Sequence, residues 1–474
     1  MRTILKKKFS IKSLLANYDS YKETSLLNRR FKHKEIIPLI KKLQEHSMFT
    51  IAKAGESLEG REIFLVSTGK GKTKILLWSQ MHGDESTATM AMFDIFNFFL
   101  ADDNFNNLRK EILEKTTLFF IPMLNPDGAE KFKRQNASEI DINRDAKKLL
   151  FPESQILESV YRKIKPKFAF NLHDQNSNYT VGITGKPAVL SFLAPPFDYY
   201  NSLNNARKLS IQVIIDIYNK VSKIIPNQIA RYNDEYEPRA FGDNFVKRGT
   251  SSILIESGGK RDELTKQEIR KLNFATLLIG FHSIASNSYR NLAIIKYKEI
   301  LENKELMFDV LLKNITIETN GKEYKIDIGI NYEEYSTEDY ESSFYVGKIK
   351  DIGDLSIYGA YDTFDCTDMY LNQGKTYQKK FKSFEKIKKL DFKKLYSDGF
   401  VSVILNSEWI NEKYTSLPIN ILRNEKSVCY EISVENNANF VLINNNKVEQ
   451  VVINGFVHSL KSKNNSILNG AIFN

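Results

Sequence analysis

Cysteine is scarce in this chain of 474 residues, which contains only Cys366 and Cys429. Because the two are far apart in the sequence, they define no disulfide framework, and we expect both thiols to be reduced. No apolar run approaches the length needed to cross a membrane. The charged start is followed by no apolar core of the kind that a signal peptide has. These absences predict a cytoplasmic protein with no membrane partner.

Nucleic-acid binding is also not indicated, although the chain is basic. It has 68 Lys and Arg against 58 Asp and Glu, a formal net charge of +10. The lysines are spread along the chain without an interleaved aromatic pattern, so we interpret them as solvated surface. The length and the 42% hydrophobic content predict a globular protein with a large core and two or three domains.

Hydrophobic patterning divides the chain into four regions. Residues 1–30 form a polar, basic lead. Residues 31–290 alternate strand-like and helix-like segments, including amphipathic stretches at 206–224 and 266–284, which predicts a sheet with helices on both faces. Residues 291–309 are expected to be a helical connector, and residues 310–474 a mostly β accessory region.

A β-hairpin is predicted near the start of the accessory region, where alternating stretches flank Asn320-Gly321. Further strands are predicted at 400–405, 428–434, 440–443 and 448–453. The region has no cluster of metal ligands, because Cys366 with Asp365 and Asp368 is better interpreted as a turn. We see no internal repeat.

A histidine and a glutamate three residues apart follow the apolar run at 75–78. These are His82 and Glu85, and residues 86–100 are predicted to be a helix with Ser86 as its N-cap. The pair therefore lies at a strand-to-helix turn, next to the crevice in which α/β sheets bind ligands. The spacing is typical of metal ligands, but a catalytic zinc takes three protein ligands.

Only six histidines are present, so the search for a third ligand is short. His173 is the best candidate, because it ends a predicted strand at 168–172 and can reach the same crevice. The other four are interpreted as solvated or packed residues: His33, His46, His282 and His458.

Three further stretches fit the same chemistry. A strong turn signal, Asn-Pro-Asp-Gly at 125–128, follows an apolar run. Arg134 and the pair Asn143 and Arg144 come next, and Glu256 ends a β-branched run. Each has an alternative role: the arginines could be solvated, Asn143 could cap a turn, and Glu256 could accept backbone hydrogen bonds.

The order of these residues resembles the zinc carboxypeptidase family, the metallocarboxypeptidases. The resemblance extends from about residue 33 to about residue 287 and includes the approach to the first central strand at 55–63. It implies an α/β fold with a mixed central sheet and helices on both faces. It also implies one zinc ion per chain, held by His82, Glu85 and His173, with a position left open for water.

The resemblance gives roles to the other residues as well. Glu256 would be the general base, and Arg134 would polarise the scissile carbonyl and hold the oxyanion. Asn143 and Arg144 would bind the terminal carboxylate of the substrate, since a guanidinium can bind both oxygens. The expected activity is hydrolysis of C-terminal residues from peptides that have a free carboxylate.

Two features of the substrate site stay open. Tyr232 and Tyr236 both qualify as the tyrosine that closes over the substrate, and Tyr236 is taken as the candidate. Asp243 would favour basic terminal residues if it faces the side-chain pocket, but it could equally cap a turn. Neither the preferred terminal residue nor the oligomeric state follows from the sequence.

Two other functions are alternatives to a carboxypeptidase. A zinc hydrolase of the aspartoacylase and desuccinylase type has similar ligands, an Asn-Arg pair and a trailing β domain, yet cleaves N-acyl amino acids. The long catalytic region and the Asn-Pro-Asp-Gly turn favour a peptidase. A non-catalytic binding protein on the same scaffold should lack a ligand or the base, and this chain lacks neither.

Overall fold

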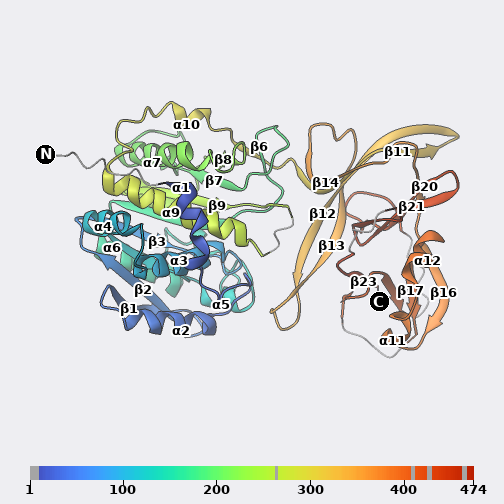
Figure 1. Cartoon of the computed structure of the whole chain (residues 1–474), viewed down its shortest axis with the longest axis horizontal. Coiled ribbons are helices and arrows are strands. Elements are labelled where there is room, and N and C mark those ends of the chain that lie inside the picture. The colour runs from blue at the N-terminus through green and yellow to red at the C-terminus, as the bar shows by residue number, and fades with distance from the viewer. Residues whose placement is uncertain (1–9, 262–264, 407–411, 424–429, 462–466, 474) are drawn as a thin grey trace. The chain divides into compact units, whose positions relative to one another are not determined.

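The computed structural model of this protein describes residues 10–261, 265–406, 412–423, 430–461 and 467–473. The chain divides between Glu305 and Leu306 into two compact units, each of which is described by itself (Figure 1). Among the described residues, no helix combines the length and the apolar character needed to span a lipid bilayer.

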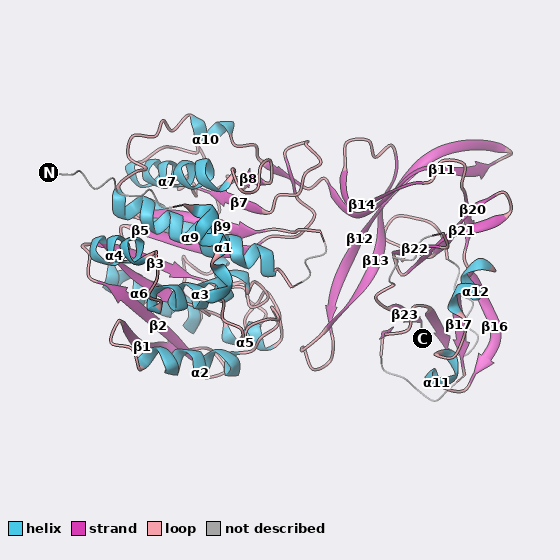
Figure 2. Ribbon diagram, viewed as in Figure 1, coloured by secondary structure: helices cyan, strands magenta, loops and turns pink. Residues whose placement is uncertain are grey.

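An eight-stranded mixed sheet forms the centre of the N-terminal unit, in the order β1-β2-β4-β3-β5-β9-β7-β8 (Figure 2). Its strands are β1 (Phe49–Glu56), β2 (Glu62–Gly69), β3 (Thr73–Trp78), β4 (Thr116–Ile121), β5 (Phe168–Asp174), β7 (Leu190–Leu193), β8 (Ile229–Arg231) and β9 (Ser251–Ser257). The four central strands, β4, β3, β5 and β9, run parallel. Parallel strands buried on both faces need near-continuous apolar sequence, which is why the runs at 75–78 and 168–172 form them.

Helices cover both faces of this sheet, which confirms the predicted fold class (Figure 2). Residues of α2, α3, α4, α7 and α9 share one apolar core with the sheet, and residues of α6 and α8 share another on the opposite side. The helices are α1 (Ile11–Ala16), α2 (His33–Gln44), α3 (Thr87–Leu100), α4 (Asn106–Lys115), α5 (Pro126–Glu130), α6 (Pro152–Ile164), α7 (Asn205–Val221), α8 (Phe241–Lys247), α9 (Gln267–Ser286) and α10 (Lys296–Glu299), with 3-10 turns η1 (Tyr18–Ser20) and η2 (Ile142–Arg144). The amphipathic stretches predicted at 206–224 and 266–284 are α7 and α9.

The segment before α2 packs into the core of the N-terminal unit. Tyr18 and Leu26 are buried. The Tyr18 hydroxyl donates to Asp94 of α3 at 2.8 Å, and Arg270 of α9 donates through Nε to the same carboxylate at 2.8 Å. Arg270 also donates to the carbonyl oxygens of Leu26 and Glu23. This fully buried ion pair therefore fastens the segment to both α3 and α9.

The described residues of the C-terminal unit form two sheets. The larger has the order β13-β12-β11-β15-β20-β21-β22, with β14 paired to β11, and the smaller has the order β16-β17-β19-β23-β18. Their strands are β11 (Met307–Thr319), β12 (Lys322–Ser336), β13 (Ser343–Gly353), β14 (Gly359–Asp365), β15 (Tyr370–Gln373), β16 (Lys375–Phe381), β17 (Phe400–Leu405), β18 (Tyr414–Thr415), β19 (Asn420–Arg423), β20 (Phe440–Asn444), β21 (Lys447–Ile453), β22 (Phe456–Ser459) and β23 (Gly470–Phe473). Two short helices are α11 (Phe384–Ile387) and α12 (Phe392–Ser397).

The predicted hairpin is confirmed, since Asn320 and Gly321 join β11 to β12 with φ of 52° and 70°. Three of the four later strand predictions are also confirmed, as β17, β20 and β21. The strand predicted at 428–434 is wrong for residues 430–434, which belong to no strand. Residues 428 and 429 lie outside the described residues, and with them Cys429. Cys366 is buried, and its thiol is free.

Candidate functional site

Three buried side chains meet beyond the ends of β3 and β5. His82 and Glu85 lie on the turn between β3 and α3, and His173 lies in β5. The Nδ1 atom of His82 is 2.8 Å from Glu85 Oε1, and the Nδ1 atom of His173 is 2.7 Å from Glu85 Oε2. The two Nδ1 atoms are 3.1 Å apart. The structure therefore brings together the three residues predicted to hold a metal.

The turn that carries His82 depends on a close backbone contact. A Cβ atom on Gly83 would lie 2.1 Å from the carbonyl carbon of Gly128, in the Asn-Pro-Asp-Gly segment. That segment begins α5, with the Asn125 side chain accepting the N–H of Gly128 at 2.9 Å. Ser86 is the N-cap residue of α3, as predicted, but its side chain makes no capping hydrogen bond, since its hydroxyl donates to the carbonyl of Arg29 at 2.6 Å.

The donor set fits a zinc ion. One atom from each of His82, Glu85 and His173 lies within 4.8 Å of the others, and no other such group of three occurs in the described part of the chain. Burial lowers the pKa of His173, which keeps its ring neutral. Burial opposes ionisation of Glu85, but the two histidines lower its pKa well below the usual range. A neutral imidazole and an ionised carboxylate are the forms that bind zinc.

Asp141 contacts both the metal site and Arg134, and the sequence analysis gave it no role. Its Oδ1 is 3.1 Å from Nε2 of His82 and accepts the backbone N–H of Asn143 at 2.8 Å. Burial opposes its ionisation, but His82 and Arg134 lower its pKa below the ordinary range. A carboxylate on the far nitrogen of a ligand histidine fixes the tautomer and orientation of the ring. The feature of the sequence that could have pointed to Asp141 is an aspartate directly before Ile142-Asn143-Arg144, a position where it caps the turn η2.

Arg134 extends toward the same centre. Its Nη1 lies 3.1 Å from Glu85 Oε1 and 3.0 Å from His82 Nδ1. Its Nε and Nη2 both donate to Oδ2 of Asp141, at 3.2 Å and 2.9 Å. The guanidinium is therefore held beside the three clustered side chains, where it can stabilise negative charge that develops there.

Glu256 stands next to His173 because of strand register. The two are Cα partners in the parallel pair β5 and β9, so both side chains leave the same face of the sheet at the same level. Burial raises the pKa of Glu256 well above its usual range, and the charges of Glu85 and Asp174 add to this effect. A carboxyl group with a raised pKa, close to a metal site but not part of it, suits proton transfer.

Asn143 and Arg144 lie on η2. The Asn143 side-chain oxygen accepts the backbone N–H of Phe241 at 3.1 Å, which joins η2 to the start of α8. The Arg144 side chain is 37% exposed, and its Nε lies 3.2 Å from Oε2 of Glu237. Nothing in the sequence pattern pointed to this ion pair.

The two candidate tyrosines lie in different surroundings. The charge of Glu256 is the main cause that raises the pKa of Tyr232, so Tyr232 lies near the candidate base. Its ring centroid is 6.5 Å from that of Tyr179, a residue that the sequence analysis missed. Tyr236 packs edge-on against a different tyrosine, Tyr199, with ring centroids 4.9 Å apart.

Asp243 lies on α8 and is buried. It accepts the backbone N–H of Glu237 at 3.1 Å, and burial raises its pKa to about 7. The nearby charge of Arg144 opposes that rise, while Asp243 itself raises the pKa of Tyr236. The charge of Asp243 thus interacts with both Arg144 and Tyr236.

Comparison with known proteins gives a family for the part of the chain that contains this centre. Residues 36–180 match the family model of zinc carboxypeptidases, a range that includes His82, Glu85 and His173. We call residues 36–180, which are similar to this family, the zinc carboxypeptidase segment. Glu256 lies outside the matched range.

Named relatives match only a part of this chain. A protein named probable carboxypeptidase 2, from Arthroderma benhamiae, is 27% identical over 111 residues, which is 23% of this chain and 20% of that protein. Carboxypeptidase SOL1 of Arabidopsis thaliana is 35% identical over 72 residues, 15% of each chain. The chain thus spans a fifth or less of the length of these curated relatives. A metallo-carboxypeptidase structure from Burkholderia cenocepacia aligns with a TM-score of 0.46 and 15% identity, over 54% of this chain and 70% of that one.

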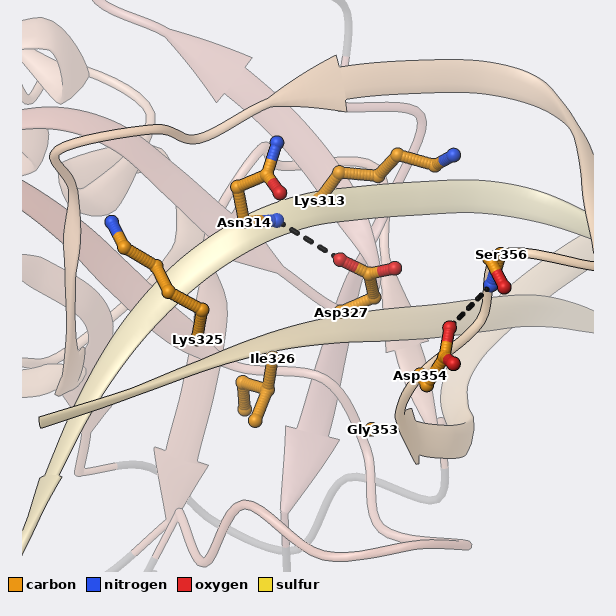
Figure 3. Close-up of a pocket in the computed structure, with 8 residues that line it drawn as sticks. All are labelled: Lys313, Asn314, Lys325, Ile326, Asp327, Gly353, Asp354 and Ser356. Carbon is orange, nitrogen blue, oxygen red and sulfur yellow. Dashed lines mark hydrogen bonds between the residues drawn. The ribbon is translucent and has the colours of Figure 1, made fainter.

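A surface hollow in the C-terminal unit lies outside the zinc carboxypeptidase segment (Figure 3). Its lining residues are Lys313, Asn314, Lys325, Ile326, Asp327, Gly353, Asp354 and Ser356. The two carboxylates are already used by the backbone, since Asp327 accepts the N–H of Asn314 at 2.9 Å and Asp354 that of Ser356 at 3.1 Å. Two of its lining residues, Lys313 and Asn314, lie where the pairing of β11 and β12 is irregular, between Leu312 and Ile315.

Proposed function

We propose that the N-terminal unit is a zinc-dependent carboxypeptidase that removes C-terminal residues from peptides. The observation that carries this proposal is the convergence of His82, Glu85 and His173, with the carboxyl group of Glu256 beside them but outside the donor set. One zinc ion per chain, when bound there, would supply a Lewis acid and lower the pKa of water to about 7.

Glu256 is the residue we assign to proton transfer. It takes a proton from the attacking water and delivers it to the leaving amine, which requires a carboxylate close to the reacting atoms. Its fixed position in β9, next to His173 in β5, supports this assignment, because the backbone ladder sets its distance from the donor set.

Arg134 is assigned to the carbonyl oxygen of the scissile bond. Two hydrogen bonds to Asp141 aim its guanidinium, so little reorganisation is needed when negative charge develops on that oxygen. Where single donors of this kind have been removed from other enzymes, the loss has been about 3 kcal/mol.

The terminal residue of the substrate is assigned to the neighbourhood of Arg144. Asn143 and Arg144 bind the terminal carboxylate, and the Arg144 guanidinium is partly exposed, so a substrate can reach it. Tyr236 and Asp243 face the terminal side chain. Because burial raises the pKa of Asp243 to about 7, its preference for a basic side chain develops as the pH rises through neutrality.

The test is a substrate screen with the purified, zinc-loaded protein. We expect hydrolysis of peptides with a free C-terminal carboxylate and much slower hydrolysis of the matching C-terminal amides. The Arg144→Ala variant should lose most of this preference. Cleavage of N-acyl amino acids but not of peptides would replace the proposal with an acyl hydrolase, and peptide binding without turnover would replace it with a binding protein.

A further inference from the structure

A carboxylate of the protein itself already occupies Arg144, the residue assigned to the substrate's terminal carboxylate. Oε2 of Glu237 lies 3.2 Å from Nε of Arg144. The same carboxylate binds Arg239 on both oxygens, with Nη2 to Oε2 at 2.7 Å and Nε to Oε1 at 2.9 Å. Hydrogen bonding to Arg239 is the main cause that lowers the pKa of Glu237, so Glu237 is ionised at neutral pH.

This contact uses the same chemistry that binds a peptide terminus. A carboxylate on a guanidinium is a charge-assisted pair with defined geometry, whether the carboxylate comes from Glu237 or from a substrate. Arg144 has five N–H donors. Its Nε faces Glu237, and its Nη1 donates to the carbonyl of Asn143 at 3.0 Å. A peptide terminus therefore meets a guanidinium that is already neutralised and partly saturated.

We propose that Glu237 competes with the substrate's terminal carboxylate for Arg144. When a substrate binds, Glu237 leaves Arg144 and stays paired with Arg239. The inference rests on the proposed function, because it takes Arg144 as the carboxylate-binding residue. Glu237 would then weaken the binding of acid-terminated peptides and leave amide-terminated peptides unaffected, so it lowers the discrimination between them.

The surrounding backbone allows this exchange without moving the loop. The N–H of Glu237 is fixed by Asp243 at 3.1 Å, and the carbonyl of Arg239 accepts the N–H of Ala146 at 3.0 Å. The Glu237 side chain is 27% exposed and the Arg239 side chain 56%. A side-chain rotation is therefore enough to release Arg144, because Arg239 keeps the displaced charge paired.

The experiment compares three variants by calorimetry and by steady-state kinetics. The ligands are an acetylated dipeptide and its C-terminal amide, added to zinc-loaded protein. Glu237→Gln should bind the acid about threefold more tightly, the scale of a partly exposed ion pair, and bind the amide as wild type does. Its KM for acid-terminated peptides should fall with little change in kcat. The matched control is Glu235→Gln, which removes an exposed charge from the same loop. It should change the affinity for neither the acid nor the amide.

Arg239→Gln gives a second result of opposite sign. It leaves Arg144 as the remaining guanidinium on Glu237, so the competitor binds Arg144 more firmly and the acid should bind more weakly. Equal acid affinity in Glu237→Gln and wild type, or equal tightening for acid and amide, would overturn the inference. The two measurements test the two claims separately. Absence of turnover would end the assignment as a hydrolase, whereas the affinities for the acid would still show whether Glu237 competes with it for Arg144.

Discussion

Replacing Asp141 by Asn should separate metal binding from catalysis, because the two oxygens of this carboxylate serve different residues. Oδ1 contacts His82 Nε2 and the N–H of Asn143, whereas Oδ2 accepts two hydrogen bonds from Arg134. An asparagine keeps one oxygen, which can stay with His82 and Asn143. Its NH₂ group then faces the N–H groups of Arg134, donor against donor, and the guanidinium must move.

The expected magnitudes follow from this division. Since the contact to His82 survives in Asp141→Asn, zinc affinity should fall by less than about tenfold, the lower end of the effect of outer-shell substitutions. Displacement of Arg134 by about 1 Å should reduce kcat by roughly a hundredfold. Asp141→Ala removes both contacts, so its zinc affinity should fall by about tenfold to a hundredfold as well.

The assay is zinc affinity by competition with a chelator, measured beside kcat for an acid-terminated peptide. Asp145→Asn is the control, because Asp145 is a buried carboxylate at the other end of η2 and its side chain accepts the backbone N–H of Phe151 at 3.0 Å. The reasoning would be refuted by an Asp141→Asn enzyme with near-normal kcat, or by one that loses zinc to the same extent as Asp141→Ala.

Three further predictions concern the donor set, the base and the acidic residue on α8. His173→Ala should lose most of the bound zinc in elemental analysis, whereas His282→Ala should keep about one ion per chain, because His282 lies on α9 beside Glu111. Glu256→Gln should keep its zinc and its thermal midpoint while kcat falls by about a hundredfold to ten-thousandfold; a stable, zinc-loaded variant with most of its kcat would end the assignment as base. Because burial raises the pKa of Asp243 to about 7, it is neutral below that pH and charged above it. The ratio of kcat/KM for a C-terminal Lys over a C-terminal Leu should therefore rise with pH through about 7, and Asp243→Asn should abolish this rise.

The sequence predicted the sheet and the clustering of the donor set because both depend on short-range patterns. His173 and Glu256 each end an apolar run, and apolar runs of this kind form the central parallel strands. Once those strands pair in register, the two side chains are neighbours without any further information. Binding of zinc, the roles of the individual residues and the cytoplasmic location stay predictions.

The contacts that the sequence did not reveal join loops that are far apart in the chain. Glu237 meets Arg144 across 93 residues, and Asp141 meets His82 across 59. No periodicity links such positions, so a single sequence gives no signal for them beyond the residue types. The strand predicted at 428–434 failed for a related reason: Tyr430 is buried, but burial in this unit does not require a place in a β-ladder.

Because of the buried pair of Asp94 and Arg270, the N-terminal boundary that folding requires differs from the boundary that similarity to known proteins gives. The family match begins at residue 36, after the segment that this pair fastens to α3 and α9. A shortened protein that starts there would keep His82 and Glu85, yet the apolar cover from Tyr18 and Leu26 would be missing. Asp94 would also lose the hydrogen bond from Tyr18, on the helix that follows Glu85 directly. The smallest piece suitable for expression is therefore longer at its N-terminus than the smallest piece that can be recognised.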